Sequence, residues 1–92
     1  MIFITLIKWK KTPSKRTQDD IDTVDKYTKM EKQWEKQGNK LKVYWTLGRY
    51  DAVWVMEAQT EKEAMKGLLV WQDFIETETM VAIPREEAIK LL

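Results

Sequence analysis

The chain has 92 residues, 43% of them hydrophobic and 34% charged, which is the composition of one folded domain spanning residues 1–92 rather than of a disordered segment. Its 16 basic and 15 acidic side chains leave a net charge of +1, which gives no overall electrostatic reason to bind nucleic acid. Cysteine and histidine are absent, which excludes disulfides, thiolate nucleophiles, Ser-His-Asp chemistry and nearly every zinc, copper or His-ligated haem site. Metals with oxygen ligands and cofactor-free chemistry stay open, and of these we expect the case with neither a metal nor a cofactor.

The first half of the chain predicts a buried strand, a loop and a helix. Residues 2–7 are apolar on nearly all of both alternating faces, which is typical of a strand covered on two sides. This run ends at Lys8 and is too short for a signal peptide or a membrane span, so we expect a cytoplasmic protein without a membrane partner. Residues 8–15 are basic and include a proline, which indicates a loop, and residues 18–37 favour a helix that stops at Gly38.

The second half predicts a β-hairpin followed by a second helix. Two strand-like runs, residues 41–47 and 52–58, flank a glycine-led loop at residues 48–51, which is the pattern of a hairpin. Residues 60–63 have the spacing of a capping box, in which a threonine and a glutamate side chain each accept a hydrogen bond from the other's backbone N–H. A helix should follow this box and end near residue 71.

The order of the elements predicts a ferredoxin-like α+β fold. A last strand-like run at residues 74–83, followed by a short C-terminal helix that Pro84 opens, completes the order βαββαβ. In this arrangement a four-stranded antiparallel sheet carries the two main helices on one face, with the first and third strands in the centre. The pattern agrees, because residues 2–7 and 52–58 are apolar on nearly both faces whereas the other two strands each have a polar face.

The second face of such a sheet predicts a homodimer. Two helices cover only one face, so the central strands leave either Trp54 and Met56 or Val53 and Val55 open to water, and an apolar patch of this kind is typical of an interface. A second copy of the chain, packed sheet on sheet about a two-fold axis, covers the patch most simply. The alternative is that the C-terminal helix folds over this face.

Three side chains are candidates for acid–base chemistry. Asp51 stands at the mouth of the hairpin as a possible general base, and the neighbouring phenol of Tyr50 as a donor to a developing oxyanion. The alternative is structural: Gly48 turns the chain with a positive φ, Asp51 accepts backbone N–H groups, and Tyr50 packs over the sheet edge. Glu31 falls inside the apolar stripe of the first helix, where burial raises a carboxyl pKa, unless it lies at the edge of the stripe beside a lysine or arginine.

Five tryptophans and five methionines predict either a ligand pocket or a tightly filled core. Flat aromatic side chains line pockets for apolar or aromatic molecules, and large side chains also fill small cores and interfaces. The candidates for ligand contacts are Trp34, Trp45, Trp54 and Arg49. The basic loop at residues 8–16 is a candidate for gripping phosphate, but the aromatic pattern of RNA-binding sheets of this topology is missing, so we expect no nucleic-acid partner.

Two stretches carry a family resemblance. Residues 37–51 (QGNKLKVYWTLGRYD) resemble the central motif of the GYD domain family, and residues 76–84 (ETETMVAIP), followed by Glu86 and Glu87, resemble its final motif. The positions that match these motifs are Gly48, Tyr50, Asp51, Thr79 and Glu87. The resemblance covers most of the chain and implies a ferredoxin-like fold of the dimeric α/β-barrel kind. It departs at residues 10–16, where the family has a threonine–glycine turn and this chain has a basic loop without glycine.

The expected function is that of a homodimeric small-molecule-binding or regulatory module with an apolar, aromatic cleft. One alternative is a cofactor-independent enzyme, of the monooxygenase or isomerase kind found among relatives of the dimeric barrel, with Asp51 as base and Tyr50 and Glu31 assisting. The other alternative is a structural protein whose apolar sheet serves assembly alone.

Overall fold

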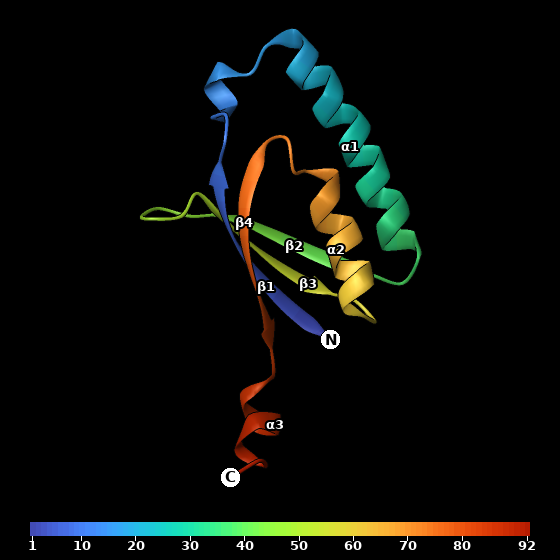
Figure 1. Cartoon of the computed structure of the whole chain (residues 1–92), viewed down its shortest axis with the longest axis vertical. Helices are drawn as coiled ribbons and strands as arrows, with labels where there is room; N and C mark the ends of the chain where they lie inside the picture. The colour runs from blue at the N-terminus through green and yellow to red at the C-terminus, as the bar shows by residue number, and fades with distance from the viewer.

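A computed structural model, which describes all of residues 1–92, contains a four-stranded antiparallel sheet with the spatial order β2-β3-β1-β4 (Figure 1). Both main helices lie on the same side of this sheet. The elements along the chain are β1 (Ile2–Trp9), the 3-10 turn η1 (Pro13–Lys15), α1 (Gln18–Lys36), β2 (Lys40–Trp45), β3 (Ala52–Glu57), α2 (Glu61–Val70), β4 (Ile75–Ala82) and α3 (Arg85–Ile89). The predicted ferredoxin-like order is therefore confirmed. None of the helices combines the length and the apolar character needed to cross a membrane.

Side chains of the two central strands alternate between a face that the helices cover and an open face. Phe3 of β1 and Trp54 and Met56 of β3 are buried beneath the helices. Val53 and Val55 point to the opposite face, which no helix covers, and are only half-buried. Of the two pairs that the sequence left open, Val53 and Val55 are therefore the ones on the open face, because β3 pairs with β1 in the register that turns its even-numbered residues toward the core.

The helices meet at a contact between Trp34 of α1 and Gly67 of α2. A Cβ atom at Gly67 would lie 3.1 Å from the indole ring of Trp34, which is closer than ordinary packing allows. The indole is 5% exposed, and its Nε1 donates a hydrogen bond to the carbonyl oxygen of Glu63 over 2.7 Å. The missing side chain at Gly67 thus makes the room that Trp34 occupies between the helices.

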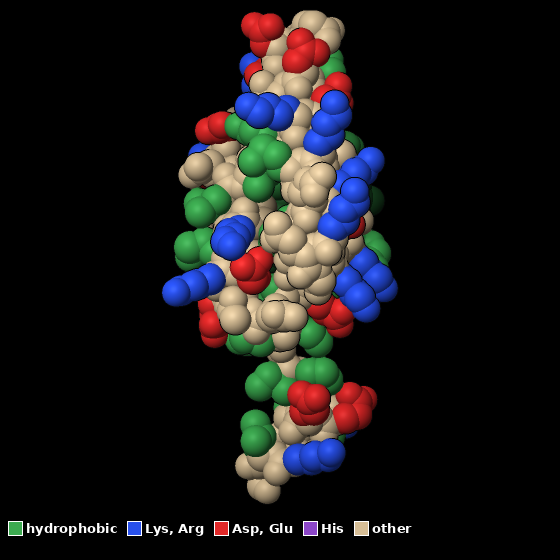
Figure 2. Space-filling model, turned by 90° about the vertical axis from the view of Figure 1, so that its right-hand side faces the viewer, with side chains coloured by type: hydrophobic (Ala, Val, Ile, Leu, Met, Phe, Trp, Pro, Cys, Tyr) green, Lys and Arg blue, Asp and Glu red, His purple; other side chains and the backbone are tan.

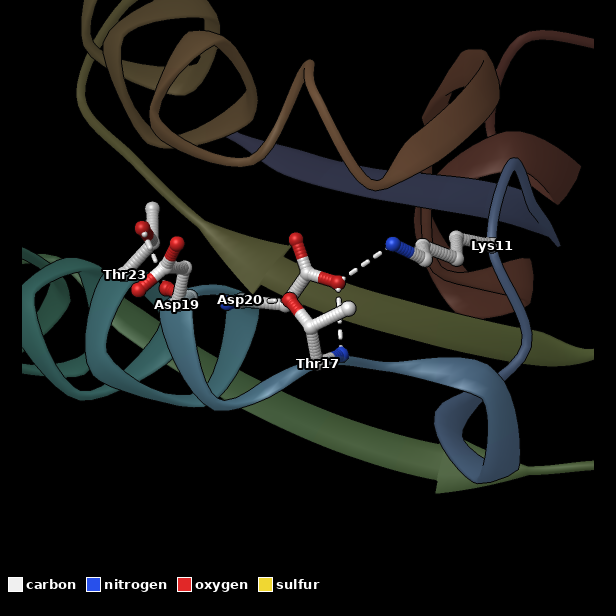
Figure 3. Close-up of polar contacts among 5 residues, drawn as sticks. All are labelled: Lys11, Thr17, Asp19, Asp20 and Thr23. Carbon is white, nitrogen blue, oxygen red and sulfur yellow. Dashed lines mark hydrogen bonds and ion pairs between the residues drawn. The ribbon is translucent and has the colours of Figure 1, made fainter.

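The first turn of α1 is held by a reciprocal capping box that the sequence analysis did not identify. The Thr17 hydroxyl accepts from the backbone N–H of Asp20 over 3.3 Å, and Asp20 Oδ2 accepts from the backbone N–H of Thr17 over 2.8 Å (Figure 3). Lys11 Nζ donates to the same carboxylate oxygen over 2.5 Å and ties the loop after β1 to the helix. The hydrogen bond from Lys11, with those from Thr17, lowers the pKa of Asp20 to about 2.

The capping box expected at the start of α2 is formed on one side. The Thr60 hydroxyl accepts from the backbone N–H of Glu63 over 3.2 Å, as expected. The Glu63 carboxylate, however, binds Lys66 Nζ over 2.9 Å. A lysine one turn ahead therefore takes the carboxylate that would have closed the box.

The C-terminal helix does not return to the sheet. α3 projects beyond the end of β4 and stands apart from the rest of the molecule (Figure 1). Figure 2, which views the side that carries the helices, shows the same segment joined to the body by a narrow neck. Its apolar residues Ile89, Leu91 and Leu92 are exposed. The alternative in which this helix covers the open face is therefore wrong, and that face stays uncovered within one chain.

Gly67→Leu is expected to destabilise the protein by about 1–3 kcal/mol, because the added atoms displace the buried Trp34 ring. Urea unfolding followed by far-UV circular dichroism measures the change. Met65→Leu is the matched control, since Met65 lies on the same helix with its side chain 58% exposed, and it should change stability by less than about 0.5 kcal/mol. A Gly67→Leu variant as stable as the wild type would contradict the close approach of the helices.

Candidate functional site

A small cavity lies between α1 and the helix-covered face of the sheet. Its volume is about 210 Å³, and seven of its ten lining residues are hydrophobic. The lining consists of Trp9, Trp45, Trp54, Trp71, Val24, Val43, Ile75, Arg16, Thr28 and Glu31. Flat apolar walls with a few polar groups are the usual composition of a small-molecule site. We call this space the tryptophan cavity.

Four tryptophans form most of its walls and are held by edge-to-face contacts. The ring centres of Trp9 and Trp45 lie 5.4 Å apart, and those of Trp54 and Trp71 lie 6.4 Å apart, with the rings close to perpendicular in both pairs. Such pairs contribute about 0.5–1.5 kcal/mol beyond the burial of their area. Trp54 lies in the core, whereas Trp45 is 69% exposed at the rim. The walls are therefore fixed inside and open to solvent at one side.

Arg16 brings a positive charge to the cavity without a carboxylate beside it. Its guanidinium carbon lies 5.3 Å from the ring centre of Phe74 and 5.7 Å from that of Trp9, so two aromatic rings hold the cation. No ion pair within 4 Å involves Arg16, and its buried Nε has no hydrogen-bond partner. A buried donor without an acceptor costs about 1–3 kcal/mol. The fold therefore keeps this cation in an energetically unfavourable place.

Glu31 lines the same cavity in a half-buried position. Burial is the main cause that raises the pKa of its carboxyl group, the nearby charge of Glu35 raises it further, and an interaction with the indole N–H of Trp71 opposes the rise. This interaction falls short of hydrogen-bond geometry, so the buried Nε1 of Trp71 has no hydrogen-bond partner. The cavity thus contains a second unpaired donor, next to a carboxyl group that is easier to protonate than usual.

The loop between β2 and β3 holds one wall of the cavity from outside. Gly48 has a φ of 122°, which only glycine adopts readily, and this lets the chain turn. Asp51 Oδ2 then accepts a hydrogen bond from the backbone N–H of Trp9 over 2.8 Å, and the Asp51 N–H donates to the carbonyl oxygen of Ile7 over 2.8 Å. The Asp51 carboxylate therefore accepts a backbone N–H group, as the structural alternative for this residue expected. This hydrogen bond fixes the end of β1, from which the Trp9 side chain reaches the cavity.

Tyr50 and Arg49 lie apart from the tryptophan cavity. The Tyr50 hydroxyl donates to Glu78 Oε2 over 3.0 Å, and this hydrogen bond is the main cause that raises the pKa of the phenol. The Arg49 guanidinium lies 5.7 Å from the Tyr50 ring centre. Both residues line a separate hollow of about 250 Å³ together with Leu6, a residue of the open face.

The site residues expected from the sequence therefore fall into groups. The structure brings together Glu31, Trp45 and Trp54 at the tryptophan cavity. Asp51 supports that cavity through the backbone, whereas Tyr50 and Arg49 face the other hollow and Trp34 is packed between the helices. No three acidic side chains come close enough together to hold a metal ion.

Sequence reasoning named only Glu31, Trp45 and Trp54 among the ten lining residues, and three of the seven that it did not name matter most to the site. Trp9 carried a usable signal, since continuing the strand past Lys8 puts it on the same face as Ile7. Trp71 caps the end of α2, near the residue at which the sequence predicts that this helix ends, but its position across from Glu31 depends on how two elements pack. Arg16 belongs to an irregular loop, and no periodicity indicates where such a side chain points.

The fold and the cavity together define a ferredoxin-like α+β protein with a small aromatic site between its sheet and its first helix. The chain belongs to the GYD domain family, whose model matches residues 3–92. No curated protein matches the sequence. The resemblance based on the hairpin motif is confirmed over nearly the whole chain. Membership of the family supports the fold, but a fold does not by itself define an activity.

Asp51→Ala is expected to lower the free energy of unfolding by about 1–3 kcal/mol, because it leaves the backbone N–H of Trp9 without an acceptor. Asp51→Asn retains a side-chain carbonyl oxygen and should lose less than half as much. Urea unfolding at neutral pH measures both, with the exposed Asp25→Ala as control for the lost charge. Equal stability of Asp51→Ala and the wild type would show that the hydrogen bond to Trp9 is not needed.

Glu31→Gln is expected to stabilise the protein at neutral pH. Since the folded state raises the pKa of Glu31, folding disfavours its ionised form, and the resulting loss of stability is complete above the folded-state pKa and absent below the ordinary value of 4.5. The advantage of the glutamine should therefore disappear as the pH falls through this range. Urea midpoints measured across the range test this, with the exposed Glu61→Gln as control. An advantage that stays constant with pH would contradict it.

Proposed function

We propose that the protein is a homodimeric small-molecule-binding module that holds an apolar or aromatic molecule in the tryptophan cavity. One observation carries the proposal: the two buried N–H groups without acceptors, Arg16 Nε and Trp71 Nε1, both belong to residues that line this cavity. Buried donors are nearly always paired in folded proteins, so two unpaired ones at a single site need a reason. A bound molecule that carries an acceptor supplies one.

The size and surface of the cavity limit the occupant. Sites for drug-sized molecules measure roughly 300–1,000 Å³. The tryptophan cavity, at about 210 Å³, suits a molecule of one or two rings. Its indole walls offer apolar surface, and each Å² of apolar area that they cover contributes roughly 25 cal/mol. A flat, largely apolar molecule therefore gains most from the site.

Titration with phenol and with benzamide, followed by isothermal titration calorimetry, tests binding in the cavity. Thr28→Leu puts a larger side chain into the cavity and should weaken binding about tenfold or more. Thr23→Leu is a matched control, because both threonine hydroxyls donate to a carbonyl oxygen of the preceding turn of α1 while Thr23 does not line the cavity. Failure of every aromatic probe to bind the wild type, or equal binding by the two variants, would overturn the proposal.

The open face of the sheet supports the homodimeric part of the proposal. Ile4 and Leu6 of β1 lie opposite Val55 and Val53 of β3, so four half-buried apolar side chains form the centre of this face. A second copy is the occupant that fits, because the two edge strands beside this centre carry opposite charges. A face that is apolar in the middle and oppositely charged at its two edges can be complementary to itself.

The charges also favour one arrangement of the two copies. Lys42 lies on the β2 edge and Glu78 on the β4 edge, and neither forms an ion pair within the chain. A two-fold axis along the strands lays β2 of one copy over β4 of its partner and brings these opposite charges together. An axis across the strands lays β2 over β2 and brings lysines together. Packed sheets lie about 10 Å apart, which long charged side chains can span.

Sedimentation equilibrium tests the dimer, which we expect at micromolar concentration. Val55→Asp introduces a charge at the centre of the open face and should shift the protein to monomer. Met65→Asp adds the same charge on the exposed surface of α2 and should leave the dimer intact. Lys42→Glu should weaken the dimer more at low than at high salt. A wild type that is monomeric at micromolar concentration would overturn this part of the proposal.

A second candidate function is proton transfer by Glu31. The raised pKa of this carboxyl group, in a cavity large enough for a small substrate, favours it, because a group that titrates nearer to neutral pH exchanges protons efficiently there. Phenylpyruvate, which has acidic C–H groups, is a suitable probe in deuterated water. Exchange catalysed by the wild type and lost in Glu31→Gln would support this candidate, and equal exchange rates in the two would exclude it.

A further inference from the structure

We propose that the molecule held in the tryptophan cavity is a small aromatic carboxylate, whose ring lies among the indoles and whose carboxylate pairs with Arg16. This inference rests on the proposed binding function and adds the chemical class of the ligand. It starts from a charge that the chain leaves without a counter-charge. All three ion pairs of the molecule involve lysines, and Arg16 has no carboxylate within 4 Å.

The lack of a counter-charge for Arg16 is unusual because of where this side chain lies. Arg16 is half-buried, and a cation withdrawn from water is unfavourable unless it is paired and hydrogen-bonded. The rings of Phe74 and Trp9 compensate in part through their faces. They accept no N–H hydrogen bond of ordinary geometry, however, and Nε stays unpaired. A ligand oxygen with negative charge would supply the acceptor and the counter-charge together.

None of the other basic residues of the same loop lines the cavity, and two of them are engaged elsewhere. Lys10 Nζ donates to the carbonyl oxygen of Gln72 over 2.7 Å, and Lys11 is paired with Asp20. Neither lines the cavity. The loop therefore presents a single cation there, and this cation is a guanidinium, whose planar fork of N–H groups matches a carboxylate better than the ammonium group of lysine does.

The remaining polar groups of the cavity agree with an anionic ligand. Glu31 is the one acidic residue in the lining, and it lies too far from Arg16 to form an ion pair with it. Because burial raises the pKa of Glu31, the charge that would repel an anion is easier to remove than at an exposed glutamate. The indole N–H of Trp71 adds a further donor without a hydrogen-bond partner.

The walls exclude the alternatives to an aromatic acid. Seven of the ten lining residues are hydrophobic, so a fully hydrated anion such as phosphate or acetate would lose its water to surfaces that cannot replace it. A neutral aromatic molecule would fill the walls but leave Arg16 unpaired, and an aromatic amine would add a second positive charge. Of the classes compared, a ring that carries a carboxylate satisfies the walls and the guanidinium together.

Benzoate and benzamide separate charge from shape, because they have nearly the same size and differ in the charge of one group. Isothermal titration calorimetry and tryptophan fluorescence should show benzoate binding to the wild type about tenfold more tightly than benzamide, as a charge-assisted hydrogen bond to a guanidinium predicts. Acetate, which carries the charge without the ring, should compete with benzoate only weakly.

Arg16→Gln should reduce the ratio of benzoate to benzamide affinity to about one, and Arg16→Lys should give an intermediate ratio. Lys15→Gln is the matched control, since it removes the same charge from the adjacent exposed position, which does not line the cavity, and it should keep the wild-type ratio. If Arg16→Gln does not fold, the wild-type ratio together with Arg16→Lys still decides the question.

The outcomes separate the two proposals. Equal binding of benzoate and benzamide to the wild type, or an unchanged ratio in Arg16→Gln, would overturn the carboxylate inference and leave the binding function standing. Absence of binding by every aromatic probe, phenol included, would overturn both. Loss of the preference in Lys15→Gln as well as in Arg16→Gln would assign it to the general charge of the loop and so would also contradict the role of Arg16.

Discussion

The two helices cover only one face of the sheet, and this constraint divides the whole molecule. Because side chains alternate along a strand, every second residue of β1 and β3 must enter the covered layer and the others must leave it. Phe3 and Trp54 are held in the covered layer, and Trp9 reaches the tryptophan cavity because it continues the same alternation. Val53 and Val55 follow the opposite phase. One backbone register thus creates both the aromatic cavity and the apolar open face.

The hairpin motif that carries the family resemblance contributes hydrogen bonds both on the side of the tryptophan cavity and at the β4 edge of the sheet. Gly48 turns the chain, Asp51 binds the backbone of Trp9 on the cavity side, and Tyr50 reaches Glu78 at the other edge of the sheet. The motif is therefore a junction that fixes β1 against both neighbouring strands. In this protein the aspartate positions an aromatic wall through a backbone hydrogen bond, and the wall then determines what the cavity can hold.

The fold could be predicted from the sequence because it depends on periodicity, which the chain displays clearly. Apolar runs on both faces identify β1 and β3 as central strands, and glycine at two positions marks the ends of α1 and β2. The site could be predicted only in part. Trp34 and Trp54 both occur in apolar patterns, so the sequence does not distinguish them. Trp34 packs against Gly67 between the helices, whereas Trp54 lines the cavity. Arg16 depends on the path of an irregular loop, and Lys11 and Asp20 fix that path through a contact that follows no periodic pattern.

The pairing of β1 has a consequence for the order in which the protein can form. Ile2 pairs with Glu57 on one side and with Ala82 on the other, so the first strand of the chain finds its neighbours only among residues made much later. Contacts so distant in sequence slow folding, because bringing the two segments together costs the entropy of closing a long loop of chain. The β2–β3 hairpin and the long helix α1 depend on contacts between residues near in sequence, so they can form without the distant strands. On a ribosome, β1 would therefore emerge as an apolar strand without a partner, and the tryptophan cavity would be among the last features to close.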